Sequence, residues 1–247
     1  MKTILITGAS RGIGRETALL CGKRGWSVGI NYVGDEQAAE ETAEMVRDAG
    51  GQAFVVKGDV AAEADVIAMF DKTEHALGRI TGVVINAGII APSLALADMS
   101  VERLRRVFEV NVLGAYLCAR ESARRLAHDR GGKGGSVVLL SSAAARLGAP
   151  FEFTDYAGSK GALDTLTIGL SKELGLQGVR VNAVRPGLIE TDIHASGGQP
   201  DRAQRLGATT PMGRPGQASE VAEAIVWLLS DAASYITGAI LDVAGGR

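Results

Sequence analysis

The feature of this sequence that most constrains its fold is a glycine-rich turn between an apolar run and an amphipathic segment. Residues 3–7 are apolar or β-branched, residues 8–14 read Gly-Ala-Ser-Arg-Gly-Ile-Gly, and a helical pattern follows at once. A strand, a tight glycine turn and a helix in this order are typical of dinucleotide-binding units, because the helix start offers unpaired N–H groups to a phosphate. The alternative interpretation is an ordinary glycine-rich loop.

Short apolar runs alternate with longer amphipathic ones along the rest of the chain. We expect seven strands, at residues 3–7, 27–32, 53–57, 82–86, 136–140, 179–184 and 240–243. We expect helices between and after them, at residues 12–24, 36–49, 63–77, 101–127, 156–175 and 219–230. Apolar strands separated by helices indicate an α/β protein with a parallel sheet covered on both faces. The expected class is one doubly wound Rossmann domain over residues 1–247.

Composition excludes several classes of function. The 247 residues carry a net charge of -2 without a clustered basic excess, so a nucleic-acid partner is not expected. No apolar run is long enough to span a bilayer, and the N-terminus leads directly into a strand rather than a signal peptide. The two cysteines show no metal-ligand spacing, so no metal site is expected. We therefore expect a cytoplasmic protein that binds neither membrane nor nucleic acid.

Tyr156 and Lys160 stand four residues apart in an expected helix, so their side chains share one face. An ammonium beside a phenol favours the phenolate and is expected to lower the tyrosine pKa from its usual value of about 10. The spacing alone is common, and a surface pair is the alternative. The pair follows both the glycine turn and a serine pair, Ser141 and Ser142. That order favours hydride chemistry on a carbonyl or alcohol.

The three glycines of the turn suit separate tasks in binding a dinucleotide. Gly8 permits a tight turn, Gly12 lets backbone approach a phosphate, and Gly14 permits close packing of the helix on the strand. Two later positions fall at the carboxyl ends of expected strands, where ligands bind such sheets. There Asp59 suits the adenine amino group or caps the next helix, and Gly88 allows close approach of the cofactor.

The end of the second expected strand bears on the choice between NAD and NADP. NAD binding favours a carboxylate at this point, but the strand ends with Asn31 and Tyr32. Asp35 lies beyond a glycine and is expected to be the N-cap of the next helix. Arg11 in the glycine turn can supply positive charge for a 2′-phosphate. We therefore expect NADP(H) to be preferred, with NAD(H) possible.

Together these motifs resemble the classical short-chain dehydrogenases/reductases over essentially the full length of the chain. The resemblance is greatest to the branch that contains 3-oxoacyl-carrier-protein reductases and bacterial sugar dehydrogenases. The matching positions are residues 7–14, Asp59, Val60, Asn86, Ala87, Gly88, Asn111, Ser142, Tyr156, Lys160, Pro186, Gly187, Thr237, Gly238, Gly245 and Gly246. Ile85 departs from the family, which usually has asparagine there. The loop between Ser142 and Tyr156 is one residue longer than in typical acyl-carrier reductases, which weakens transfer of their substrate.

The resemblance implies a catalytic set of four residues. Tyr156 would be the general acid and base, and Lys160 would lower its pKa and hold the nicotinamide ribose. Ser142 would bind the substrate oxygen, with Ser141 as the competing serine. Asn111 would hold a water that links Lys160 to solvent, or else be a satisfied core amide. The implied cofactor site is formed by Gly8, Ser10, Arg11, Gly12, Ile13, Gly14, Asn31, Tyr32, Asp59, Val60, Asn86, Ala87, Gly88, Tyr156, Lys160, Pro186, Gly187, Ile189 and Thr191.

The resemblance also implies a homotetramer, in which helices 101–127 and 156–175 pack against their mates. Both carry more apolar residues than one core-facing stripe needs, including Leu113, Leu117 and Leu170. The expected substrate is a small carbonyl or alcohol, such as a 3-oxoacyl thioester, a sugar or another small ketone. A non-catalytic NADP-binding redox sensor is the alternative function.

Residues 188–215 form the one long stretch without a clear pattern, and they contain several prolines and a Gly-Gly pair. Long irregular segments in compact domains are usually functional or disordered. We expect this one to close over cofactor and substrate as a lid. A rigid helical excursion is the alternative. His194, within it, is expected to be a surface or substrate-lining residue.

Overall fold

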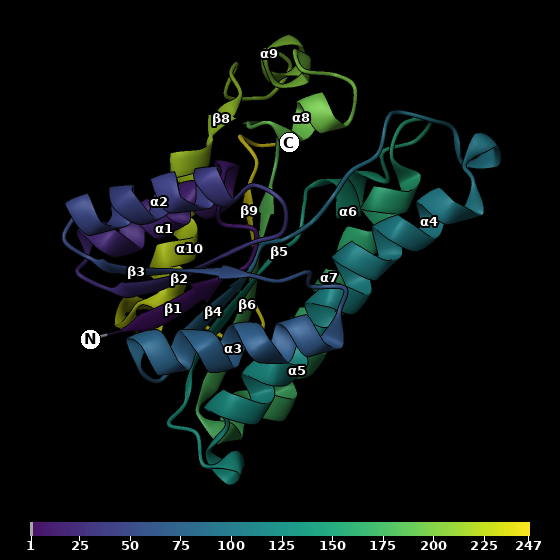
Figure 1. Ribbon diagram of the computed structural model, residues 1–247. Coiled ribbons are helices and arrows are strands. Elements are labelled where there is room, and N and C mark those ends of the chain that lie inside the picture. Colours follow the sequence, from purple (N-terminus) through teal and green to yellow (C-terminus); the bar gives the residue numbers. More distant parts are fainter. Residues whose placement is uncertain (1) are drawn as a thin grey trace.

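The computed structural model describes residues 2–247, except for the side chain of His194, so the expectation for that side chain lies outside the described part. The frame is a seven-stranded parallel sheet in the order β3-β2-β1-β4-β5-β6-β9 (Figure 1). Its strands are β1 Thr3–Ile6, β2 Ser27–Tyr32, β3 Gln52–Lys57, β4 Gly82–Ile85, β5 Gly135–Leu140, β6 Val179–Pro186 and β9 Ile240–Val243. The order reverses between β1 and β4, as in a doubly wound sheet. The predicted fold class is confirmed.

Helices cover both faces of this sheet (Figure 1). One layer contains α1 Gly12–Lys23, α2 Glu36–Asp48 and α10 Ala218–Leu229, and the other contains α3 Glu63–Leu77, α5 Gly114–Leu126 and α7 Thr154–Leu174. Strand side chains alternate between the two cores. In β1, for example, Ile4 and Ile6 pack under the first layer and Leu5 under the second. All three are fully buried.

The helix expected over residues 101–127 is present but is not α-helical throughout. The structure has α4 Val101–Phe108, a π-helical turn at Glu109–Leu113, and then α5. The π turn contains Asn111, whose side chain bonds both the N–H and the C=O of Ile89. Such turns inside α-helices are frequent at functional sites.

Residues 188–215 have more regular structure than the sequence indicated. They contain β7 Ile189–Glu190, α8 Ile193–Ser196 and α9 Arg202–Gly207, and β7 pairs with β8 Gly216–Gln217. Figure 1 shows α8 and α9 together at the top of the molecule, apart from the two helical layers. A further short helix, α6 Ala144–Leu147, follows β5. The two short helices within residues 188–215 agree with the alternative of a helical excursion. Closure of these residues over cofactor and substrate stays a prediction.

In the part of the chain that the structure describes, no helix is both long and apolar enough to cross a membrane.

Candidate active site

The glycine turn has the geometry that the sequence predicted. Gly8 and Gly12 have φ of 62° and 56°, which is the left-handed region that favours glycine. A Cβ at Gly14 would lie 2.5 Å from the carbonyl oxygen of Gly8, so only glycine lets α1 pack on the turn. At Gly12, by contrast, a Cβ would meet only Thr191, at 3.5 Å. The turn therefore lies at ordinary contact distance from the residue that follows β7.

The start of α1 is suited to an anion. Its N-cap, Arg11, makes no side-chain capping bond, and the first N–H groups of a helix have no partner within the helix. The Arg11 side chain is exposed, and no hydrogen bond or ion pair from it is found among the described residues. Arg15 is instead held by the carbonyl of Ser10 and the hydroxyl of Thr42. Of these two arginines, Arg11 is the one free to meet a phosphate.

Asn31 has a different place from the one expected. Its side chain is buried, its oxygen accepts from the N–H of Gly8 at 3.1 Å, and its amide donates to the carbonyl of Gly58 at 2.9 Å. The side chain thus ties the glycine turn to the end of β3 and does not face a ribose. Next to it, burial and a hydrogen bond to Glu36 raise the pKa of Tyr32. The sequence analysis did not identify the Glu36 carboxylate near the end of β2.

The residues after β3 and β4 lie at the carboxyl edge of the sheet as expected. The Asn86 amide donates to the carbonyls of Thr7 and Gly8, each at 2.8 Å, and so fastens β4 to β1. Asp59 accepts from the N–H of Ala61 at 2.9 Å and lies 3.6 Å from Arg106. Asp59 does not cap α3, because the N-cap of that helix is Ala62. One carboxylate oxygen supports the local turn and the other faces Arg106, so contact with the adenine amino group stays a prediction.

Other residues of the expected cofactor site have structural contacts. Ile13 and Ile189 pack in the core under α1, and Val60 packs in the core on the other face. The N–H of Ala87 donates to the Thr7 hydroxyl at 3.0 Å. Pro186 accepts from the N–H of Ala143 at 2.9 Å, which sets the end of β6 beside the residue after Ser142.

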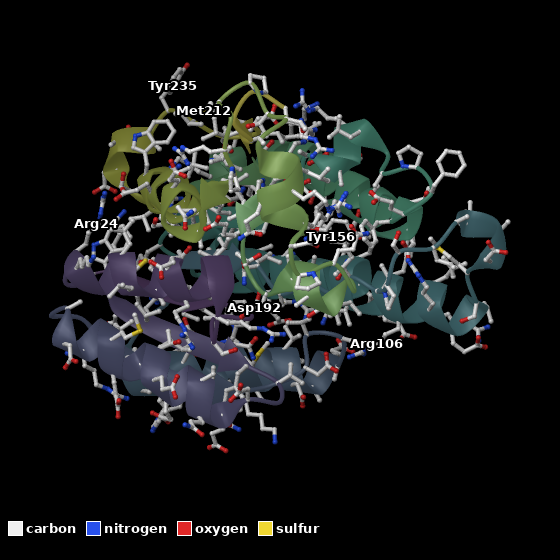
Figure 2. All side chains as sticks on the ribbon, turned by 90° about the horizontal axis from the view of Figure 1, so that it is seen from above. Arg24, Arg106, Tyr156, Asp192, Met212 and Tyr235 are labelled. Carbon is white, nitrogen blue, oxygen red and sulfur yellow. The ribbon has the colours of Figure 1, made fainter. Side chains whose placement is uncertain are left out.

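Three side chains, two from α7 and one from the turn after β5, converge at this edge. Tyr156 in α7 is half-buried and hydrogen-bonded to the Ser142 hydroxyl, which follows β5. The Lys160 ammonium lies 5.6 Å from the centre of the Tyr156 ring. A Cβ at Gly88 would lie 3.3 Å from the Lys160 ammonium, so the backbone after β4 comes directly against it. Figure 2 shows Tyr156 and Asp192 near the centre of the molecule.

The structure separates the two serines. The Ser141 hydroxyl is buried and donates to the carbonyl of Lys160 at 3.1 Å. The Ser142 oxygen accepts from the N–H of Ala144 at 3.1 Å and is the partner of Tyr156. Ser142 is therefore the serine that faces the site, as the sequence interpretation preferred.

The expected effect of Lys160 on Tyr156 is wrong for this structure. Burial raises the pKa of Tyr156, and the hydrogen bond from Ser142 partly offsets that rise. Burial also lowers the pKa of Lys160 to about 8, against the opposing charge of Asp164. The ammonium donates to the carbonyl of Leu140 at 2.6 Å rather than to the phenol. Desolvation thus disfavours both the phenolate form of Tyr156 and the ammonium form of Lys160.

Asn111 is fully buried, and its side chain is satisfied by protein groups. It bonds the backbone of Ile89 in both directions, at 2.8 and 2.9 Å, and donates to the hydroxyl of Ser159 at 3.0 Å. This matches the satisfied-amide alternative. A role in holding a water stays a prediction.

Two ion pairs beside Tyr156 were not found from the sequence. Arg103 bonds Asp155, 52 residues away, and Arg202 bonds Glu152, 50 residues away. Local pattern carries no signal for such pairs, because the partners become neighbours only when the sheet and helices are assembled.

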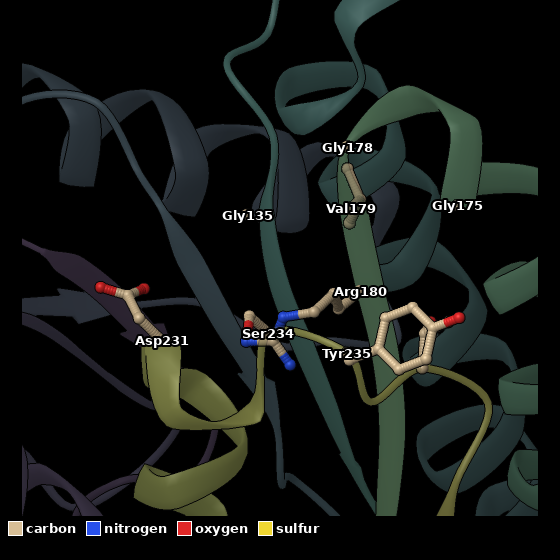
Figure 3. Close-up of a pocket in the computed structure, with 9 residues that line it drawn as sticks. Gly135, Gly175, Gly178, Val179, Arg180, Asp231, Ser234 and Tyr235 are labelled. Carbon is tan, nitrogen blue, oxygen red and sulfur yellow. The ribbon is translucent and has the colours of Figure 1, made fainter.

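A cavity also lies away from this site. It has a volume of about 550 Å³ and is lined by residues at the amino ends of β5 and β6, including Gly135, Val179 and Arg180 (Figure 3). The Arg180 guanidinium donates to the carbonyls of Leu228 and Ser230, so it is used to hold the fold. This cavity is at the opposite edge of the sheet from Tyr156.

Comparisons with known proteins identify similar oxidoreductases. The family model for enoyl-(acyl carrier protein) reductase matches residues 8–247. The chain is 50% identical to an uncharacterized oxidoreductase, YgfF, of Escherichia coli K12, over the full length of both. It is 37% identical to an L-rhamnose 1-dehydrogenase (NAD(P)(+)) of Sphingomonas sp. SKA58, covering 99% of this chain and 95% of that protein. The structure of levodione reductase matches with a TM-score of 0.92 and 28% identity, covering 99% and 96% of the two chains.

The chain therefore belongs to the short-chain dehydrogenase/reductase family. It is an oxidoreductase of alcohols and ketones that uses NAD(P)(H). The family resemblance inferred from the sequence is confirmed.

Proposed function

We propose that this enzyme prefers NADP(H) and interconverts a small ketone and its secondary alcohol, with Tyr156 as general acid and base. The observation that carries the proposal is the convergence of Tyr156, Ser142 and Lys160 at the carboxyl edge of the sheet, beside the glycine turn. Bound NADP(H) supplies or accepts the hydride.

The chain fits that cofactor. The left-handed backbone at Gly12 and the unpaired N–H groups at the start of α1 suit a pyrophosphate. The close approach of the Gly88 backbone to Lys160 suits a nicotinamide ribose that contacts both. Arg11 supports the preference for a 2′-phosphate, because its side chain is exposed at the turn and a guanidinium suits phosphate recognition.

In this proposal the residues divide the proton chemistry between them. Tyr156 donates its phenolic proton to the carbonyl oxygen during reduction and takes it back during alcohol oxidation. Ser142 holds the same oxygen and stabilises the charge that develops on it. Because burial raises the pKa of Tyr156, the phenol is protonated at neutral pH and suits the role of acid.

Replacing Tyr156 by Phe tests the proposal. The Tyr156→Phe variant should fold and bind NADPH normally but lose at least ~10²-fold in kcat, the scale of a general acid. Tyr235, which is fully exposed, provides a matched control, and Tyr235→Phe should keep full activity. Retention of more than half of the wild-type turnover by Tyr156→Phe would refute the assignment.

The substrate can be found with a defined panel. Relatives are named as dehydrogenases of L-rhamnose, of cis-4-hydroxycyclohexanecarboxylate and of glucose. We therefore propose to assay NADP⁺ with these sugars and with cyclohexanols, and NADPH with butane-2,3-dione, ethyl acetoacetate and an acetoacetyl thioester. Turnover of none of these classes would contradict a small-ketone substrate.

We further propose a homotetramer, supported by exposed apolar side chains on the helices expected at its interfaces. Phe108 on α4, Leu113 in the π turn and Tyr116 on α5 are exposed. Ile168 is exposed on α7. Leu117 and Leu170, which the sequence suggested for an interface, belong to the core instead. A monomer in light scattering at micromolar concentration would refute the tetramer.

We keep the cytoplasm as the proposed location, because Cys21 and Cys118 are both free and buried. Cell fractionation tests this directly.

A further inference from the structure

A buried ion pair holds the residue directly before Tyr156. Asp155 is the second residue of α7, and its side chain is only 1% exposed. The Arg103 guanidinium donates from Nε to Oδ2 at 2.8 Å and from Nη2 to Oδ1 at 3.2 Å. Oδ1 also accepts from the N–H of Tyr156 at 2.9 Å. The carboxylate therefore joins the guanidinium to the backbone of the proposed catalytic residue.

Arg103 also holds a second segment. Its remaining amino group donates to the carbonyl of Pro92, within residues 86–95, which follow β4 without forming a helix or strand. Asn111 holds the same segment at Ile89. The N–H of Leu94 donates to the carbonyl of Glu152 at 3.0 Å. Arg103 is thus the one side chain among the described residues that bonds both this segment and Asp155.

Burial distinguishes this arginine from its neighbours on α4. The Arg103 side chain is 12% exposed, whereas Arg105 and Arg106 are exposed. Taking both charges of a pair out of water is costly, and well-packed apolar residues often stabilise a fold equally well. A planar guanidinium fork, however, fixes distance and orientation in a way that apolar contacts do not. The pair is better suited to positioning than to stability.

We propose that Arg103 is a positioning residue for the reaction: through Asp155 it fixes the start of α7, and with it Tyr156, relative to the segment after β4. The inference rests on the proposed role of Tyr156. One guanidinium then fixes both the start of α7, which carries Tyr156, and the segment after β4. Arg103 contacts neither substrate nor cofactor in this proposal.

Substitution of Arg103 tests the inference, with NADPH and whichever carbonyl of the panel turns over fastest. Arg103→Gln should lower kcat by about 10- to 100-fold, the range for misplacing a catalytic group by about 1 Å. The dissociation constant for NADPH should be unchanged. Arg103→Lys keeps the charge without the fork and should recover part of the loss. Arg105→Gln, on the same helix, is the matched control and should retain full activity.

Asp155→Asn gives a second, independent variant in case Arg103→Gln folds poorly. It keeps the size of the side chain, and circular dichroism with thermal melting measures the folded fraction of each variant. If both variants keep more than half of the wild-type kcat, or lose it only in proportion to the folded fraction, the proposal is overturned.

A double variant separates this inference from the function on which it rests. On a Tyr156→Phe background, Arg103→Gln should change the residual rate by less than about 2-fold, because no phenol is left to position. The same loss with and without the phenol would overturn positioning in favour of a general structural role. If Tyr156→Phe is itself active, the proposed function fails whatever Arg103 does.

Hydrogen exchange provides a measurement that needs no substrate. In Arg103→Gln the amides of residues 89–95 and 155–158 should exchange faster, while those of α1 should be unchanged. Equal exchange in these segments of the two proteins would contradict the inference.

Discussion

The guanidinium of Arg202 donates to both carboxylate oxygens of Glu152, at 2.6 and 2.7 Å. Arg202 belongs to α9, and Glu152 lies four residues before Tyr156. The ion pair therefore ties residues 188–215 to the loop that leads into α7. Arg202 also lies over the ring of Phe153, 5.2 Å from its centre. The hydrogen bonds from Arg202 hold the pKa of Glu152 below its usual value.

We predict that this pair latches residues 188–215 over the substrate as a lid. In Glu152→Gln the fork is weakened, so the KM for the carbonyl should rise several-fold while the dissociation constant for NADPH stays constant. Residues 196–207 should exchange hydrogen faster. Glu173→Gln, exposed on the same helix as Tyr156, is the control. If NADP⁺ leaves exchange in this segment unchanged in the wild type, the segment is a fixed wall and not a lid.

A second prediction concerns the stability of the cofactor-free protein at alkaline pH. The pKa of Lys160 falls from 10.5 to about 8 on folding because of burial. Between these values the unfolded chain binds more protons, so the free energy of unfolding should gain up to ~1.4 kcal/mol per pH unit from this group. Below pH 8 both states hold the proton and the gain is absent.

Urea unfolding of the wild type and of Lys160→Met, at intervals from pH 7 to 10, measures this difference. The two proteins share every other titrating group, so the difference between their curves isolates Lys160. Parallel curves would show that the folded-state pKa is not depressed.

The third prediction distinguishes the two serines. Ser142→Ala removes the partner of Tyr156 and should lower kcat by about 10²-fold, the scale of one lost donor to a developing oxyanion. Ser141→Ala removes a bond to the Lys160 carbonyl and should cost about 1 kcal/mol of stability with a smaller loss of kcat. Steady-state kinetics and thermal melting of both variants measure these effects. A larger loss of kcat in Ser141→Ala than in Ser142→Ala would contradict the assignment.

The fourth prediction concerns cofactor choice. Arg11→Gln should lower kcat/KM for NADPH by about 10-fold more than for NADH, because it removes a charge-assisted bond to the 2′-phosphate. Glu36→Gln should favour NADPH, since Glu36 lies by Tyr32 at the end of β2. Arg24→Gln, at the rim of the molecule in Figure 2, is the control. An NADH preference in the wild type would refute the proposal.

Asn31→Asp is not a clean test of cofactor choice. A carboxylate at this position would lose the bond to the carbonyl of Gly58 and place two oxygens against each other. We expect that variant to lose stability before it changes cofactor preference.

Local patterns were sufficient for the sheet and the glycine turn. Alternation of apolar and amphipathic segments follows from covering a parallel sheet on both faces, and Gly8 and Gly12 mark positions where positive φ excludes most side chains. The same patterns were insufficient for the π turn at Asn111. Within this turn Asn111 makes two hydrogen bonds to Ile89, 22 residues away, and no helical periodicity records such a contact.

The sequence by itself determined the class of fold, the order of its elements and the identity of Tyr156, Lys160 and Ser142 as candidates, because each depends on neighbours within a few residues. Only the tertiary structure decided how these groups are charged and held. It buries Lys160 against the Leu140 carbonyl, commits Asn31 to the fold, and brings Arg103 to Asp155 and Arg202 to Glu152. Desolvation and long-range pairing arise from the assembled packing, so they cannot be read from the order of residues along the chain.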